Sequence, residues 1–148
     1  MEELVVNDGP DDRCFGCGHR NERGLKLRFR VREREVEAEY TADEALCGAP
    51  GVVHGGIQAA LLDEVMGMAA HAGDRSGEVD VVTADFRLRF RRPTPSGVPL
   101  RVRARLVRVE GRDYFLEGEI VGPDDEVLTR AEARWRRIER PPRPSAAS

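Results

Sequence analysis

The residues best suited to chemistry lie around the tripeptide His54-Gly55-Gly56. A run rich in Ala, Leu, Met and Val, without proline, follows it and predicts a helix over residues 57–72. No Ser, Thr, Asp or Asn precedes this helix as a cap, so we expect free backbone amides at its N-terminus. Free amides beside two glycines attract an oxyanion or the oxygen of a polarised carbonyl, because glycine allows another molecule to approach closely.

The predicted helix also carries acidic residues. The helix is apolar almost all the way round, and its polar residues are Gln58, Asp63, Glu64 and His71, so we expect it to be buried. A buried carboxylate is costly unless it is hydrogen-bonded, paired or at the wall of a cavity. Asp63 is therefore a candidate nucleophile or general base. In the alternative interpretation, which this stretch alone leaves open, the glycines allow tight packing and the two acids are paired structurally.

The rest of the chain predicts the elements that position this helix. Apolar and polar residues alternate with a period of two, which is typical of half-buried strands, over residues 25–31, 36–40, 82–90, 98–106, 114–120 and 127–135. The alternation slips at Leu106-Val107, which suggests a β-bulge. Short turns join most of these strands, so the sheet is expected to be antiparallel, with an apolar face that can cover only the central helix. The predicted fold class is α+β, with a curved antiparallel sheet around one helix.

Chain length indicates the domain organisation. The 148 residues indicate one domain over residues 14–139, a flexible N-terminus over 1–13 and a disordered tail over 140–148.

Charge and hydropathy exclude some classes of partner. The net charge is −3, and arginines alternate with glutamates along the expected strands, so we expect a salt-bridged sheet face and no nucleic-acid partner. No apolar run reaches the ~18 residues of a membrane span, and the acidic start is unlike a signal peptide. We therefore expect a cytoplasmic protein with reduced thiols and no membrane partner.

A Cys-x-x-Cys motif occurs at Cys14 and Cys17. Together with His19 and Cys47 it could supply four zinc ligands, but no second Cys-x-x-Cys completes a standard zinc ribbon. The favoured interpretation is a glycine-rich turn with small buried thiols, and no metal is expected.

These motifs together resemble the hotdog-fold acyl-CoA thioesterases of the phenylacetate-pathway (PaaI-like) superfamily, which include related mammalian acyl-CoA thioesterases. The resemblance covers about residues 14–138. It rests on Cys-Phe-Gly-Cys-Gly at 14–18 followed by Gly-Leu at 24–25, Pro-Gly-Val-Val-His-Gly-Gly at 50–56, Asp63 nine residues after the histidine, Thr-Ala-Asp-Phe at 83–86 and Arg-Pro-Thr-Pro at 92–95.

The resemblance implies a role for each matching residue. The backbone amide of Gly55 would donate to the thioester carbonyl oxygen. Asp63 would be the nucleophile or the general base, acting on a thioester held by the helix of the neighbouring subunit. Thr83 would hold Asp63 or the attacking water, and His54 would orient the loop. Some members of the family place an asparagine where this chain has Gly48, so a second ligand for the carbonyl or the water must come from elsewhere.

The resemblance also implies partners. Coenzyme A would enter as part of the substrate, near Gly56, and no other cofactor is needed. Arg91 and Arg92 could grip its phosphates, since guanidinium groups bind phosphate bidentately, although a solvated strand face explains both arginines equally well. The family's active site lies between two subunits, so an obligate homodimer is expected, and a dimer of dimers would fit as well. Glu64 faces another direction than Asp63 and is expected to pair with an arginine or with His71.

Two other functions compete with the thioesterase. One is a hotdog dehydratase or hydratase that acts on acyl-CoA or acyl-carrier protein with a histidine and an acid on opposite sides of a tunnel. The other is a non-catalytic dimer that binds acyl-CoA or an aromatic ligand, since a fold does not fix a function. The acid nine residues after His-Gly-Gly favours the thioesterase. The acyl group is not determined by the sequence.

Overall fold

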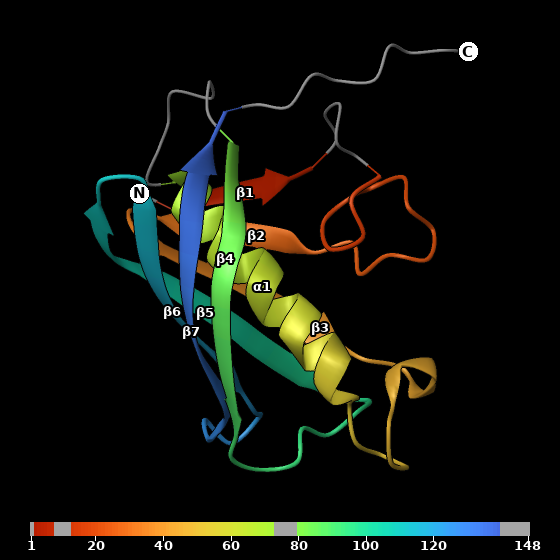
Figure 1. The fold of residues 1–148 in the computed structure, drawn as a ribbon. Coiled ribbons are helices and arrows are strands. Elements are labelled where there is room, and N and C mark those ends of the chain that lie inside the picture. The colour runs from red at the N-terminus through yellow and green to blue at the C-terminus, as the bar shows by residue number, and fades with distance from the viewer. Residues whose placement is uncertain (1, 8–12, 73–79, 140–148) are drawn as a thin grey trace.

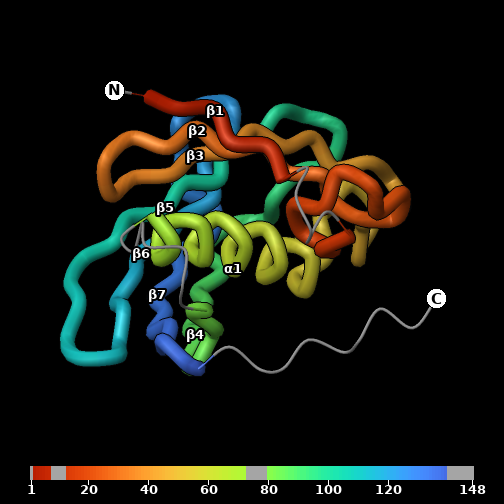
Figure 2. Tube along the Cα trace, turned by 90° about the horizontal axis from the view of Figure 1, so that it is seen from above, coloured from red at the N-terminus to blue at the C-terminus, as the bar shows by residue number. Residues whose placement is uncertain are grey.

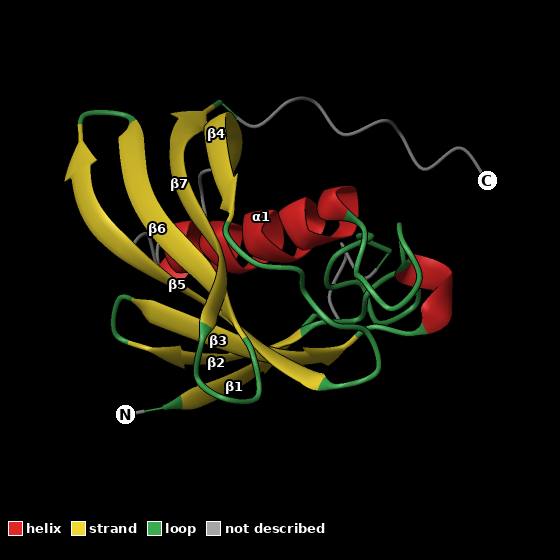
Figure 3. Cartoon of the chain, turned by 90° about the horizontal axis from the view of Figure 1, so that it is seen from below, coloured by secondary structure: helices red, strands yellow, loops and turns green. Residues whose placement is uncertain are grey.

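The protein is a seven-stranded antiparallel sheet curved around one helix, as the computed structural model shows for residues 2–7, 13–72 and 80–139 (Figures 1 and 3). The sheet order is β1-β2-β3-β5-β6-β7-β4. The elements are β1 (Glu3–Val6), β2 (Arg28–Arg32), β3 (Glu35–Thr41), a short 3-10 helix η1 (Glu44–Leu46), α1 (Gly55–Ala72), β4 (Asp80–Phe90), β5 (Pro99–Glu110), β6 (Asp113–Val121) and β7 (Val127–Ile138). The expected fold class is therefore confirmed.

Helix α1 occupies the centre of the core. It packs against β2 to β7, and the view from above shows the sheet curving round it (Figure 2). Leu61, Leu62, Val65 and Met66 are completely buried, as the apolar composition of the segment predicts. No helix in the part of the chain that the structure describes is long and apolar enough to cross a membrane.

The N-terminal segment differs from the expectation. Residues 1–13 were expected to be flexible, but Glu3–Val6 form strand β1, which pairs antiparallel with β2. Their apolar residues Val5 and Val6 are half-buried at the sheet edge, and Val5 packs against the core, which explains why this short segment is held. The expected tail over 140–148 lies outside the described residues.

Strand β4 departs from simple alternation in a way that matters for the site. The period of two predicts that Val82 and Ala84 face the helix, but the register of β4 against β7 shifts between Thr83 and Asp85. Val81 is buried and Val82 is 40% exposed, so Val81 and Thr83 face the helix before the shift. A bulge re-aims the side chains that flank it, so a sequence pattern read straight through it assigns the wrong face. The slip at Leu106-Val107 is confirmed as a second register shift, between Leu106 and Arg108.

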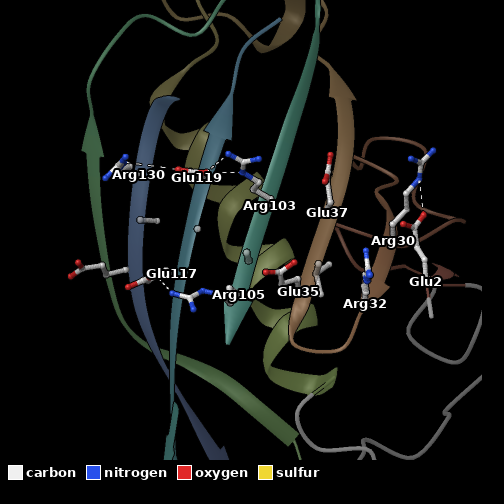
Figure 4. A pocket seen from close by; sticks show the side chains of 15 residues that line it. Glu2, Arg30, Arg32, Glu35, Glu37, Arg103, Arg105, Glu117, Glu119 and Arg130 are labelled. Atoms are coloured by element: carbon white, nitrogen blue, oxygen red, sulfur yellow. Dashed lines mark hydrogen bonds and ion pairs between the residues drawn. The ribbon is translucent and has the colours of Figure 1, made fainter. Parts of the chain in front are cut away.

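The outer sheet face carries the alternating charges that the sequence predicts. Figure 4 shows Glu119 between Arg103 and Arg130, and Arg105 beside Glu117. The Arg105–Glu117 ion pair has a nitrogen-to-oxygen distance of 2.9 Å. A hollow of about 620 Å³ lies among these side chains, on the face turned away from α1. Pairs of opposite charges line this hollow. Such ion pairs help to fix the strand register, and each contributes only about 0.2–1 kcal/mol to the stability of the fold. This hollow contains none of the residues expected to do chemistry.

Trp135 of β7 packs directly on Gly67 of α1, and this contact yields a test of the packing. A Cβ atom at this position would overlap Cη2 of Trp135 and lie 2.8 Å from its Cζ2. We expect Gly67→Ala to lower the melting temperature, because overpacking costs about 1–3 kcal/mol while the gain in helix propensity is at most ~1 kcal/mol. Introducing Gly67→Ala into a Trp135→Phe background should cost less, since the overlapped atoms are gone. Equal losses in both backgrounds, measured by thermal denaturation, would contradict this account.

Candidate active site

The entrance to α1 is closed by His54. Its carbonyl oxygen accepts hydrogen bonds from the amides of Ile57 and Gln58, both at 3.0 Å, and its Nδ1 accepts one from the Gly56 amide at 2.9 Å. The expectation of an uncapped helix is therefore wrong at one amide, because the imidazole serves as the N-cap acceptor that Ser or Asp usually provides. Gly56 consequently has no free amide to offer a ligand. The expected role of His54 in orienting the loop agrees with this contact.

Gly55 is the first residue of α1, and its amide, unlike that of Gly56, has no hydrogen-bond acceptor among the described residues, 2–7, 13–72 and 80–139. The ring of Phe90 covers one side of Gly55, with its Cζ 3.5 Å from where a Cβ atom would stand. An open amide at the positive end of a helix is suited to bind an oxygen that carries negative charge.

A buried side chain that the sequence analysis did not select supports this loop from below. Gln58 is 4% exposed, and its Nε2 donates to the carbonyl of Val53, the residue before His54, at 2.9 Å. Its Oε1 accepts from Thr94 at 3.0 Å and from Thr129 at 2.6 Å. One glutamine thus ties α1 to the loop before it, to the segment after β4 and to β7. The sequence offered one indication of this role, since Gln58 is a polar residue on a helix that is predicted to be buried.

Asp63 and Thr83 meet as the resemblance implies. The hydroxyl of Thr83 donates to Oδ1 of Asp63 at 2.7 Å, and Asp63 is half-buried. Burial raises the pKa of Asp63 above its ordinary value, and the hydrogen bond from Thr83 acts in the opposite direction. The carboxylate is therefore more basic than an exposed one while it stays oriented, which is what a general base or a nucleophile needs.

The open amide and the carboxylate do not converge within one chain. Gly55 and Asp63 are eight residues apart on one helix, a rise of about 12 Å at ~1.5 Å per residue. A reacting carbonyl held at the Gly55 amide is therefore out of reach of the Asp63 carboxylate on the same helix.

Arg91 and Arg92 are exposed and lie at the Gly55 end of the molecule. They follow Phe90, whose ring contacts Gly55, and both backbone amides donate to the carbonyl of Leu128. Neither guanidinium group forms an ion pair with an acidic side chain of residues 2–7, 13–72 or 80–139, and a solvated strand face and a phosphate site both fit this position.

Glu64 does not have the partner that was expected. Its Oε1 lies 3.6 Å from Sγ of Cys14, and it forms no ion pair with an arginine or with His71 among the residues described. His71 instead has its Nδ1 2.7 Å from the carbonyl oxygen of Gly67, and its ring meets Trp135 edge to face. Burial, and next the hydrogen bond with Glu64, raise the pKa of the Cys17 thiol. Sequence spacing could not place a loop near residue 15 against the middle of a distant helix.

The hydrogen bonds of Gln58 make a prediction about the loop. Gln58→Met keeps the approximate volume but leaves the Val53 carbonyl and the hydroxyls of Thr94 and Thr129 without this partner. We expect it to lower the free energy of unfolding by about 2 kcal/mol or more, since each buried unsatisfied group costs ~1–3 kcal/mol. Adding Thr129→Val should recover part of the loss, because it removes one orphaned hydroxyl. Strictly additive effects in urea denaturation would show that the network does not act as a unit.

Comparison with known proteins gives this geometry a family. The Thioesterase superfamily model matches residues 50–129, which include Gly55, Asp63 and Thr83. The rat acyl-coenzyme A thioesterase THEM4 is 30% identical over 96 residues, covering 65% of this chain and 40% of that protein. The chain thus spans about two-fifths of the length of this curated relative.

Solved structures of thioesterases have the same fold as this chain. A thioesterase superfamily protein has a TM-score of 0.77 and 29% identity, covering 84% of this chain and 60% of that one. A phenylacetic acid degradation-related protein from Ralstonia eutropha has a TM-score of 0.68 and 30% identity, covering 76% of this chain and 85% of its own. With the matching fold and the match over more than half of its sequence, this chain belongs to the thioesterase superfamily.

Proposed function

We propose that this protein hydrolyses acyl-CoA thioesters to a free acid and coenzyme A. The observation that carries the proposal is the Asp63 carboxylate, held by Thr83 on the helix whose N-terminal Gly55 amide is open. The relatives named as acyl-CoA thioesterases and as phenylacetic acid degradation-related proteins support the substrate class.

The two groups suit the two needs of thioester hydrolysis. Attack on the carbonyl carbon forms a tetrahedral intermediate with a negative oxygen, and the Gly55 amide would donate to that oxygen. One such donor is worth about 3–4 kcal/mol of barrier. Asp63 would either deprotonate the attacking water or attack directly to give an anhydride, which water then hydrolyses. In both routes the coenzyme A thiolate leaves when the intermediate collapses.

A second copy of the chain would bring the two groups together. Strand β4 ends the sheet, and no strand of the described residues pairs with its outer edge. Its apolar side chains Val82 and Phe90 are 40% and 53% exposed, so the strand leaves apolar groups uncovered near both of its ends. Asp63 contacts Thr83 of this strand, whereas Gly55 contacts Phe90.

Pairing of β4 with the same strand of a second copy has a specific consequence. Consider an antiparallel pair of β4 strands whose two-fold axis passes between residues 86 and 87. In this pair, Thr83 of each chain lies opposite the partner's Phe90. Asp63 of each subunit would then face the partner's Gly55. We propose that the homodimer is obligatory for this reason, with Arg91 and Arg92 at the mouth of each site for the phosphates of coenzyme A, and that two dimers can associate further.

Subunit complementation tests this arrangement. Gly55→Pro removes the amide proton yet fits the first helical position, where proline is well tolerated. Asp63→Asn and Gly55→Pro should each be inactive as homodimers. A hybrid dimer, purified with two different tags after co-expression, should regain about half of the wild-type activity, since one of its two sites has both groups. An inactive hybrid would mean that both groups act within one chain, and a monomer in light scattering would contradict the dimer.

A variant at Asp63 tests the chemical role of its carboxylate. We expect Asp63→Asn to lower kcat by at least about 100-fold. The variant should be at least as stable as wild type at neutral pH: a carboxyl group whose pKa is raised by folding destabilises the protein as pH rises through that pKa, and asparagine carries no such charge. An inactive but folded variant therefore isolates the chemical role.

The pH profile gives a further readout of the same pair. Because the carboxylate form is the active one and burial raises its pKa, the rise of kcat/KM with pH should lie above the range of an exposed aspartate. Thr83→Val removes the hydrogen bond that lowers this pKa, so the rise should move to still higher pH, while Thr83→Ser should leave it near wild type. A profile unchanged by Thr83→Val would contradict the role of Thr83.

The direct assay uses short, medium, long and aryl acyl-CoAs and follows the released thiol, with a substrate-free blank for the three cysteines of the protein. Release that prefers some acyl groups and disappears in Asp63→Asn is the expected result. Binding of acyl-CoA without release would instead favour a binding protein or, if water adds to an enoyl-CoA, a hydratase.

A further inference from the structure

The N-terminal loop contributes two cysteines to a cluster that the proposed reaction does not use. The sulfur atoms of Cys14 and Cys17 and a carboxylate oxygen of Glu64 all lie within 4.8 Å of one another. Cys17 is buried, and the other two residues are half-buried. Glu64 projects from the middle of α1, so the cluster joins the start of the chain to the central helix.

The loop is folded closely around this point. The amide of Gly18 donates to the carbonyl of Cys14 at 2.7 Å, which closes the Cys-x-x-Cys turn. The amides of Leu25 and Leu27 donate to the carbonyls of the two residues between the cysteines, at 2.8 and 3.0 Å. A Cβ atom at Gly16 would overlap the Glu64 carboxyl group, so a larger residue there would force Glu64 out of its present position. Both cysteines are thereby held on the side of the turn that faces Glu64.

The ligand types and one sulfur-to-oxygen separation fit a zinc site. Zinc binds cysteine sulfur at ~2.3 Å and carboxylate oxygen at ~2.0–2.2 Å, so a tetrahedral centre separates such a sulfur and oxygen by roughly 3.5–3.7 Å. The separation of Cys14 Sγ and Glu64 Oε1 is 3.6 Å. Two cysteines with two residues between them are the usual spacing of a zinc knuckle.

The charge of Glu64 points to a cation as well. Over the described ranges 2–7, 13–72 and 80–139, no arginine, lysine or histidine forms an ion pair with it, although the sheet face pairs many of its carboxylates with arginines. A half-buried carboxylate beside two sulfur atoms is stabilised when a divalent cation binds all three.

We propose that Cys14, Cys17 and Glu64 bind a zinc ion through two thiolates and a carboxylate, with water in the fourth position. Binding releases the two thiol protons to solvent, as metal binding by cysteine requires. The ligand set differs from the one that the sequence suggested, since Glu64 takes part and neither Cys47 nor His19 belongs to the cluster. The ion would fasten the N-terminal loop to the helix residue next to Asp63, and it takes no part in the reaction proposed above.

The test is metal binding by the reduced 148-residue protein, which is independent of hydrolysis. Metal-free protein is titrated with Co²⁺, whose thiolate charge-transfer absorption reports cysteine ligands, and then with Zn²⁺, which should displace the cobalt and remove the band. We expect one metal ion per chain and a higher melting temperature with zinc than without. The variants are Glu64→Gln, which keeps the size and a hydrogen-bonding group but loses the charge, and Cys14→Ser. Cys47→Ser is the matched control, because that thiol lies by the carbonyl of Asp43 at 3.9 Å, outside the cluster.

The expected pattern is stoichiometric cobalt binding by wild type and Cys47→Ser, and at least a 10-fold weaker affinity in Glu64→Gln and Cys14→Ser, with all variants folded in thermal denaturation. Three results would overturn the proposal: no charge-transfer band in the reduced wild type, an affinity unchanged by Glu64→Gln, or a loss of binding in Cys47→Ser. A Cys14–Cys17 disulfide in the isolated protein, with no metal bound after reduction, would also overturn it and assign the pair to redox chemistry.

Discussion

The burial of α1 is the constraint on which the rest of the structure depends. An 18-residue helix with almost no polar face has to be surrounded, and the sheet achieves this by curving until β2 to β7 all contact it. The apolar surface removed from water around this helix is the main stabilising contribution in a domain of this size. A small residue is needed where a large side chain of the sheet packs on the helix backbone, as Trp135 does on Gly67.

Each polar side chain on this buried helix consequently needs a partner from another part of the chain. Gln58 obtains it from the loop before the helix and from two threonines, Asp63 from Thr83, and Glu64 from the cysteine turn. His71 uses the carbonyl of Gly67 in its own helix. The four polar residues therefore have four different environments, which is why two adjacent acids, Asp63 and Glu64, can serve one catalytic and one metal-binding role in our proposals.

The straight helix also explains why the proposed enzyme needs two subunits. At a rise of ~1.5 Å per residue, the backbone positions of Gly55 and Asp63 lie about 12 Å apart along the helix axis, and the short side chain of Asp63 does not span that rise. Strand β4 contacts both ends of the arrangement, through Phe90 and Thr83, and it is the strand at the open edge of the sheet. One strand edge thus links the sheet topology to the dimer and the reaction that we propose.

The sequence by itself determined the fold class, the buried helix, most strands and the bulge near Leu106, because these follow from local periodicity. The resemblance left two roles open for Thr83, and the structure shows it bonded to Asp63. The sequence could not show that His54 caps the helix, that residues 3–6 pair with β2, or that Thr83, beside the bulge at Ala84, faces Asp63. Nor could it bring Cys14 and Cys17 to Glu64, fifty residues away from the first of them. These outcomes depend on which distant segments meet when the sheet closes around α1, and that is decided only when the buried polar groups of the whole domain find their partners together.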